Sequence, residues 1–189
     1  MILWTIQPVE IMDIINTTGE FYCDKKSSAN YSELKDAYDW LVSKMDERNI
    51  THPSNIELPL WAWHTRDWKH KKPDLRLAEY TKRGQRCVCI EFEIPDEDVL
   101  LSDYDNWHYV LNNAWFDDAK SDDEWDALHE WYDKLPSDEK VRLRIKSWNK
   151  VFDVIPYDDG WDSKGRYVQA TFWKLTSNMI KDVRYFTAR

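Results

Sequence analysis

Residues 86–95 read RCVCIEFEIP and form the clearest strand pattern in the chain. Apolar side chains recur at every second position from Val88 to Ile94, which is the period of a strand that packs one face on a core. Pro95 ends the pattern, because proline has no N–H to donate to a sheet. We therefore predict a central strand over residues 86–94.

Two carboxylates, Glu91 and Glu93, share the other face of this strand. If that face is buried, two neighbouring carboxylates raise the pKa of one of them and provide a general base. If it faces solvent, they have no catalytic meaning. The pattern leaves both interpretations open.

Helical patterns flank this strand on both sides. Apolar residues recur at spacings of three and four positions, as in amphipathic helices. The predicted helices run from residue 8 to 19, from 31 to 48 and from 103 to 116, and two more begin at Ser121 and Ser137. Residues expected on buried faces are Trp107, Val110, Leu111 and Trp115 in the third helix, Trp125, Leu128 and Tyr132 in the fourth, and Val141, Ile145, Trp148 and Phe152 in the fifth.

Both ends of the chain have strand patterns. Thr5 and Gln7 share one face of the first strand, and Gln169 and Thr171 share one face of a late strand. Polar groups on such faces are costly to bury without partners, so we predict that the two strands lie side by side and wall one cleft. Strands from both ends with helices between them predict a single α+β domain spanning residues 1–189.

Composition narrows the class of protein. The chain has four glycines and no GxGxxG or GxxxxGK[ST] string, which excludes a glycine-rich phosphate loop. Cys23, Cys87 and Cys89 are odd in number, so we expect reduced thiols, no bound metal and a cytoplasmic location. Because no apolar run approaches the ~20 residues of a membrane span, we expect no membrane partner.

Charge is separated along the chain, although the total is −9. Residues 64–86 hold eight Lys/Arg and three acids, a local +5, and residues 117–139 hold ten acids and two Lys, a local −8. Trp68 and Tyr80 interleave with the basic residues, which suits a nucleotide or nucleic-acid ligand at a loop. The acidic segment is either a solvated helix face or a site for a protein partner.

Two further groups of residues are candidates for ligand chemistry. Trp61 and Trp63 lie two positions apart on a predicted strand, so both rings face one side and form either core or a stacking platform. Asp105, His108 and Asn112 fall on one polar flank of a helix. There an acid can fix the tautomer of a histidine, or the three residues form structural hydrogen bonds only.

Several of these stretches resemble a known family. The strings LWTIQP (3–8), LLSDYDNWHYVLNN (100–113), VQATFWKL (168–175) and VRYF (183–186) carry the likeness over nearly the whole chain. They resemble an uncharacterised bacterial and phage family that is catalogued as a domain of unknown function. This resemblance implies no activity.

A weaker resemblance connects the two ends of the chain to DNA-targeting ADP-ribosyltransferase toxins. The opening strand, helix and glycine are similar, as is the late Gln-Ala strand with a short helix after it. The resemblance implies a split mixed sheet that binds NAD. Those toxins have a histidine where Thr5 stands, and they read Gln-Ala-Glu where this chain has Gln169-Ala170-Thr171. Their glutamate contacts ribose and supports transfer, and Glu93 is the candidate to replace it.

The resemblance leaves two main functions open. A third possibility is a phage or host interaction factor without a small ligand. The first is transfer of ADP-ribose from NAD, bound as a substrate, in phage–host conflict, with Glu93 and His108 as the candidate catalytic residues. The second is a degenerate module that binds a nucleotide, a nucleic acid or a protein. Candidate ligand contacts are Trp61, Trp63 or Tyr80 on a base or nicotinamide, Arg66, Lys72 and Arg76 on the pyrophosphate, and Thr5, Gln7, Asn112 and Gln169 on ribose or amide groups.

Overall fold

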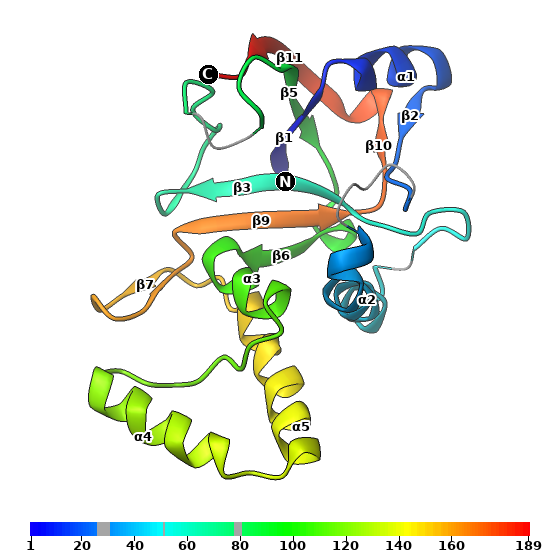
Figure 1. Cartoon of the computed structure of the whole chain (residues 1–189). Helices are drawn as coiled ribbons and strands as arrows, with labels where there is room; N and C mark the ends of the chain where they lie inside the picture. The colour runs from blue at the N-terminus through cyan, green and yellow to red at the C-terminus, as the bar shows by residue number, and fades with distance from the viewer. Residues whose placement is uncertain (26–30, 51, 78–80) are drawn as a thin grey trace.

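The computed structural model describes residues 1–25, 31–50, 52–77 and 81–189 (Figure 1). Its largest element is a sheet with the strand order β11-β5-β1-β3-β9-β6, to which β4 adds by pairing with β3. Helices and this sheet together make an α+β fold, as predicted. Every described strand pair in it is antiparallel, so the predicted mixed sheet is corrected to an antiparallel one.

The strands of this sheet are β1 (Ile2–Pro8), β3 (Leu60–Arg66), β4 (Lys69–His70), β5 (Arg86–Glu93), β6 (Leu100–Asp103), β9 (Tyr167–Phe172) and β11 (Ile180–Thr187). Two small ribbons pair β2 (Glu20–Phe21) with β10 (Leu175–Thr176) and β7 (Tyr157–Asp158) with β8 (Ser163–Lys164). The α-helices are α1 (Glu10–Thr18), α2 (Tyr31–Glu47), α3 (Tyr104–Leu111), α4 (Asp122–Asp133) and α5 (Ser137–Ser147). Short 3-10 turns are η1 (Asp96–Asp98), η2 (Trp148–Phe152) and η3 (Ser177–Met179).

The sheet is divided between β1 and β3. Along its whole length β1 pairs with β5, but it pairs with β3 only where Trp4 lies opposite Trp63. The strands β1, β5 and β11 run at a steep angle to β3, β9 and β6 (Figure 1). This junction is where side chains of the two halves meet.

The first strand and the Gln169 strand are not adjacent, which corrects the prediction. Trp63 of β3 pairs with Trp4 on one side and with Gln169 on the other, so β3 lies between β1 and β9. Alternating side chains predict that a strand exists and which residues share a face. They do not predict its neighbours, which depend on how the connections cross the sheet.

Two buried clusters occupy opposite faces of the sheet. The first joins the sheet to α1 and includes Leu3, Val88, Ile90, Phe92 and Phe172 with Met12 and Ile15. The second joins the sheet to α2, α3 and η2 and includes Leu41, Met45, Trp107, Val110, Trp148 and Val151. Both helices predicted before residue 50 are present. The first ends at Gly19, whose φ of 82° is the left-handed conformation of a helix cap.

The helix α3 is shorter than predicted. Trp107 and Val110 are buried as expected, but the helix ends at Leu111 rather than Phe116. Asn113 has a φ of 51°, a conformation that Asn adopts more readily than most residues. Trp115 therefore lies outside the helix, where it is partly buried and stacks on Tyr132 at 4.3 Å.

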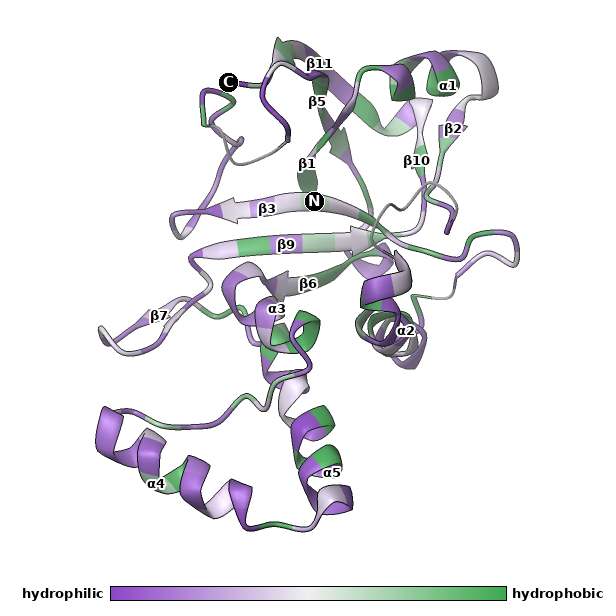
Figure 2. Ribbon diagram, viewed as in Figure 1, coloured by the Kyte–Doolittle hydropathy of each residue, from purple (hydrophilic) through white to green (hydrophobic). Residues whose placement is uncertain are grey.

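The helices α4 and α5 extend away from the sheet as an arm (Figure 1), and α4 is largely hydrophilic (Figure 2). No residue of α4 is buried, and Trp125, Val141 and Ile145 are exposed although their spacing predicted a buried face. The reason is that this arm has no sheet face to cover.

Among the helices of the described residues, none combines the length and the apolar composition that crossing a membrane requires.

Candidate functional site

A small cavity of about 230 Å³ lies at the junction of the two sheet halves. Its lining comprises Ile6, Gln7, Trp61, Ala62, Trp63, Tyr104 and Gln169. The strand β3 brings these residues together because it pairs with both β1 and β9. We call this cavity the ring pocket. Gln7, Trp61, Trp63 and Gln169 were all predicted from the sequence as ligand contacts.

Aromatic rings form fixed walls of the ring pocket. The Trp61 ring lies 5.4 Å from that of Trp107 and 6.3 Å from that of Tyr38, and the Trp63 ring lies 5.2 Å from that of Tyr104. Both tryptophans remain half-buried. Packed rings lose little freedom when a ligand arrives, so they suit stacking on a planar group.

Thr5 does not line the ring pocket. It is buried, and its Oγ1 donates to the Trp61 carbonyl at 2.8 Å and accepts from Gln7 Nε2 at 2.8 Å. The predicted ligand contact at Thr5 is therefore corrected, because its hydroxyl is already satisfied within the protein. The same bond turns the Gln7 nitrogen toward Thr5, which leaves the Gln7 carbonyl oxygen as an acceptor for a ligand.

Gln169 has unused hydrogen-bonding capacity. Its Nε2 is buried and has no hydrogen-bond partner among the described residues. The hydroxyl of Ser102, directly opposite on β6, is also buried without a hydrogen-bond partner among the described residues. A buried donor without a partner costs about 1–3 kcal/mol. A ligand acceptor at this wall would remove that cost.

A buried positive charge lies against the Trp63 ring. Arg66 is buried on β3, and its guanidinium carbon lies 4.5 Å from the Trp63 ring and 4.6 Å from the Tyr167 ring. Its place is in the sheet, not in the predicted basic loop. No carboxylate lines the pocket among the residues that the structure places.

The two predicted catalytic residues lie outside the ring pocket. Glu93 is exposed and pairs with Lys181 of β11 at 2.6 Å, which lowers its pKa. Of the two alternatives that the sequence left open, the structure favours solvent for Glu93, which speaks against its candidate catalytic role. Its neighbour Glu91 is half-buried and accepts from Trp4 Nε1 at 2.7 Å.

His108 and Asn112, on the polar flank of α3, have side-chain contacts to the backbone of their own helix. His108 Nδ1 lies 3.1 Å from the carbonyl oxygen of Tyr104, and Asn112 Nδ2 donates to the His108 carbonyl at 2.8 Å. No described hydrogen bond joins His108 to the Asp105 carboxylate, so the contacts favour the structural alternative that the sequence left open for this flank. The His108 ring packs at 5.2 Å against Tyr104 and supports that wall of the pocket.

Two predicted phosphate contacts of the basic segment, Lys72 and Arg76, form ion pairs away from the ring pocket. Lys72 pairs with Asp182 at 3.0 Å, and Arg76 pairs with Asp74 at 2.6 Å. Neither residue lines the pocket, which corrects the expectation that this segment forms its rim. Tyr80, predicted to stack on a ligand, lies outside the described residues.

Comparisons with known proteins give a family and no activity. No curated protein and no solved structure matches the chain. A family model described as Domain of unknown function (DUF3841) matches residues 2–181, which confirms the resemblance to an uncharacterised family. The match covers far more than half of the sequence, and the chain therefore belongs to the DUF3841 family.

Proposed function

We propose that this protein is an ADP-ribosyltransferase-like domain that binds the planar ring of NAD or a related nucleotide without transferring ADP-ribose. The Gln169 amide carries the proposal. Its Nε2 is a buried donor without a described partner, and the residue lines the same pocket as Trp61 and Trp63. Nicotinamide and the nucleobases combine a flat ring with amide-like hydrogen-bonding groups. Such a ring would stack on tryptophan and bond to the glutamine.

The size of the ring pocket supports one ring rather than a whole dinucleotide. Pockets for drug-sized ligands measure roughly 300–1,000 Å³, and this one measures about 230 Å³. The rest of a nucleotide would extend into solvent. The positive charge of Arg66 behind the Trp63 ring would favour a ligand that carries phosphate.

The lack of a carboxylate supports binding rather than transfer. Cleavage of the nicotinamide–ribose bond develops positive charge on the sugar, and an enzyme stabilises that charge with a fixed negative group. None lines the ring pocket in the described part of the chain. Thr171 stands where the resembling toxins have their glutamate, and it is buried with its hydroxyl bonded to the Leu100 carbonyl.

The structure gives less support to ligand binding at the basic segment 64–86. Lys72 and Arg76 are ion-paired with aspartates, as described above. A phosphate there would have to displace a carboxylate. We therefore put forward no second function at this segment.

Thermal unfolding with NAD, nicotinamide mononucleotide and AMP tests the proposal. A ligand at about 100 times its Kd should stabilise the fold by about 2.7 kcal/mol. We expect Gln169→Ala to weaken binding about tenfold. Gln85→Ala, which changes the same residue type outside the pocket, should leave binding unchanged.

Three results would contradict this proposal. The first is the absence of any stabilisation at millimolar ligand. The second is an equal loss of binding in the two glutamine variants. The third is release of nicotinamide from NAD by the wild-type protein but not by Gln169→Ala, which would show an enzyme rather than a binding module.

A further inference from the structure

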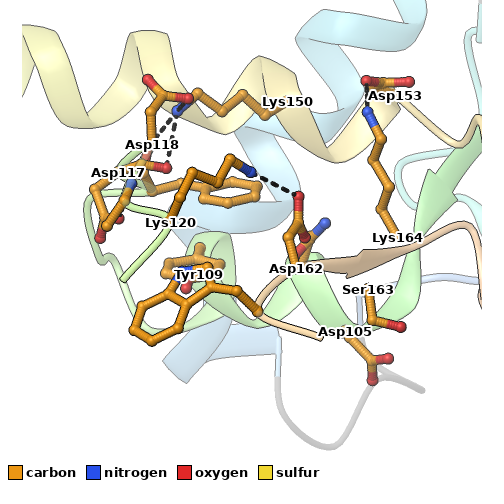
Figure 3. A pocket seen from close by; sticks show the side chains of 14 residues that line it. Asp105, Tyr109, Asp117, Asp118, Lys120, Lys150, Asp153, Asp162, Ser163 and Lys164 are labelled. Atoms are coloured by element: carbon orange, nitrogen blue, oxygen red, sulfur yellow. Dashed lines mark hydrogen bonds and ion pairs between the residues drawn. The ribbon is translucent and has the colours of Figure 1, made fainter. Parts of the chain in front are cut away.

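A second and larger cavity of about 570 Å³ shares α3 with the ring pocket (Figure 3). Its walls come from α3, the connection that precedes α4, η2 and the β7–β8 hairpin. We call it the arm pocket, because it lies at the base of the α4–α5 arm. Its volume is within the roughly 300–1,000 Å³ that accommodate a ligand of moderate size.

Lysines in the arm pocket are neutralised within it. Dashed lines in Figure 3 join each of three lysines to an aspartate. The pairs are Lys150 with Asp118 at 2.6 Å, Lys120 with Asp162 at 3.5 Å, and Lys164 with Asp153. Two more aspartates belong to the lining. Asp105 has no ion pair among the described residues, and Asp117 Oδ2 lies 3.1 Å from His129 Nε2. The pocket therefore has an excess of negative charge.

Aromatic rings line the same cavity. Tyr109 and Phe116 stack nearly parallel at 4.3 Å. Trp161 also lines the cavity and is 45% exposed. A shallower extension of about 360 Å³, also lined by Tyr109, Asp117 and Trp161, reaches Trp125, which is 43% exposed. Two large exposed rings in a region with an excess of carboxylates suit an organic cation, because it stacks on the ring face and pairs with the acid.

Ser163 adds an independent indication of a ligand. Its Oγ is buried at the wall of the arm pocket and has no hydrogen-bond partner among the residues that the structure describes. A hydroxyl in this state costs free energy until a donor or acceptor reaches it. An N–H group of a bound cation would satisfy it.

We propose that the arm pocket binds an arginine side chain presented by a basic segment of a protein partner. A guanidinium group is planar, stacks on aromatic rings and donates two parallel hydrogen bonds to a carboxylate. Residues 117–139, which run from the pocket along α4, carry a net charge of −8. That surface would attract neighbouring basic residues of the partner and speed its association. The inference does not depend on the ring pocket.

Fluorescence anisotropy with a labelled peptide of six arginines tests this proposal on the full chain. We expect Trp161→Leu to weaken binding about tenfold, since the stacking face is lost. Trp131→Leu is the matched control, because Trp131 is 48% exposed on α4 and does not line either cavity of this region. Asp105→Asn should weaken binding as well, whereas Asp126→Asn, an exposed acid outside the pocket, should not.

Three outcomes would overturn the proposal. Equal effects of Trp161→Leu and Trp131→Leu would show attraction to the acidic surface alone. Equal affinity for a peptide of six lysines would remove the role of the guanidinium plane. Competition by spermine at the same affinity through Trp161 and Asp105 would assign the pocket to a free polyamine instead of a protein.

Discussion

Gly165 occupies a position that no larger residue fits. Its φ is 70°, and a Cβ added there would lie 2.6 Å from the Val154 carbonyl oxygen. Gly160 has a similar φ of 84° but open space around it. The left-handed conformation costs a residue with a side chain about 1–2 kcal/mol. In urea unfolding we expect Gly160→Ala to cost that amount and Gly165→Ala clearly more. Equal losses would show that the neighbouring backbone yields.

His64 makes the fold sensitive to acid. It stacks on His70 at 4.4 Å, and burial, followed by the charge of His70, lowers its pKa to about 4. In the unfolded chain a histidine titrates near about 6.5. Between those values the unfolded state binds more protons, so the free energy of unfolding falls as pH falls through this window. Urea unfolding at several pH values should show a weaker dependence in His64→Phe than in the wild type. An unchanged pH dependence in His64→Phe would contradict this account.

Trp107 is one of two residues, with Val110, through which α3 joins the core. It is 4% exposed, and its ring contacts those of Trp61 and Trp40. We expect Trp107→Ala to lower the free energy of unfolding by about 3–5 kcal/mol. The exposed Trp131→Ala should change it by less than about 1 kcal/mol. A loss under 1 kcal/mol at Trp107 would show that α3 does not depend on this contact.

At the scale of elements, Asp103 ties α3 to the loop before β9. Its carboxylate accepts from Asn106 N at 2.9 Å, which caps α3, and from Gly165 N at 2.6 Å. Ser121 caps α4 in the same way but on the exposed arm. Loss of a cap costs about 0.5–2 kcal/mol. Asp103→Ala also leaves the buried Gly165 N–H without its acceptor, so urea unfolding should show a larger loss than for Ser121→Ala. The reverse order would contradict this account.

Local patterns of the sequence predicted most elements but not their arrangement. The alternation in β5 and the helical spacing in α2 depend on neighbouring residues, and both predictions were confirmed. The same spacing failed for Val141 and Ile145, because it predicts that a helix has an apolar face and not that another element covers it. The position of β3 between β1 and β9 depends on chain crossings that no local pattern records.

The residues of the candidate site that lie on strands could be predicted from the sequence. Trp61, Trp63 and Gln169 were found because strand alternation shows which rings and which polar side chains share one face. Tyr104 was missed because it begins a helix and reaches the pocket only through the pairing of β6 with β9. For Glu93 the sequence left cleft and solvent open, because alternation shows which residues share a face but not which face is covered.

At the scale of the whole molecule, the arm and the sheet should differ in local stability. Amides in a central element exchange hydrogen only when much of the fold opens, whereas a segment with few buried contacts opens alone. In β5, between two partner strands, all residues from Cys87 to Ile90 are buried, and α4 has no buried residue. Hydrogen exchange measured by mass spectrometry should therefore show α4 exchanging far faster than β5. The helix α2 serves as a control, since it has Leu41 and Met45 fully buried and should be slow. If α4 and α2 exchanged at the same rate, the arm would be held by contacts that burial does not reveal.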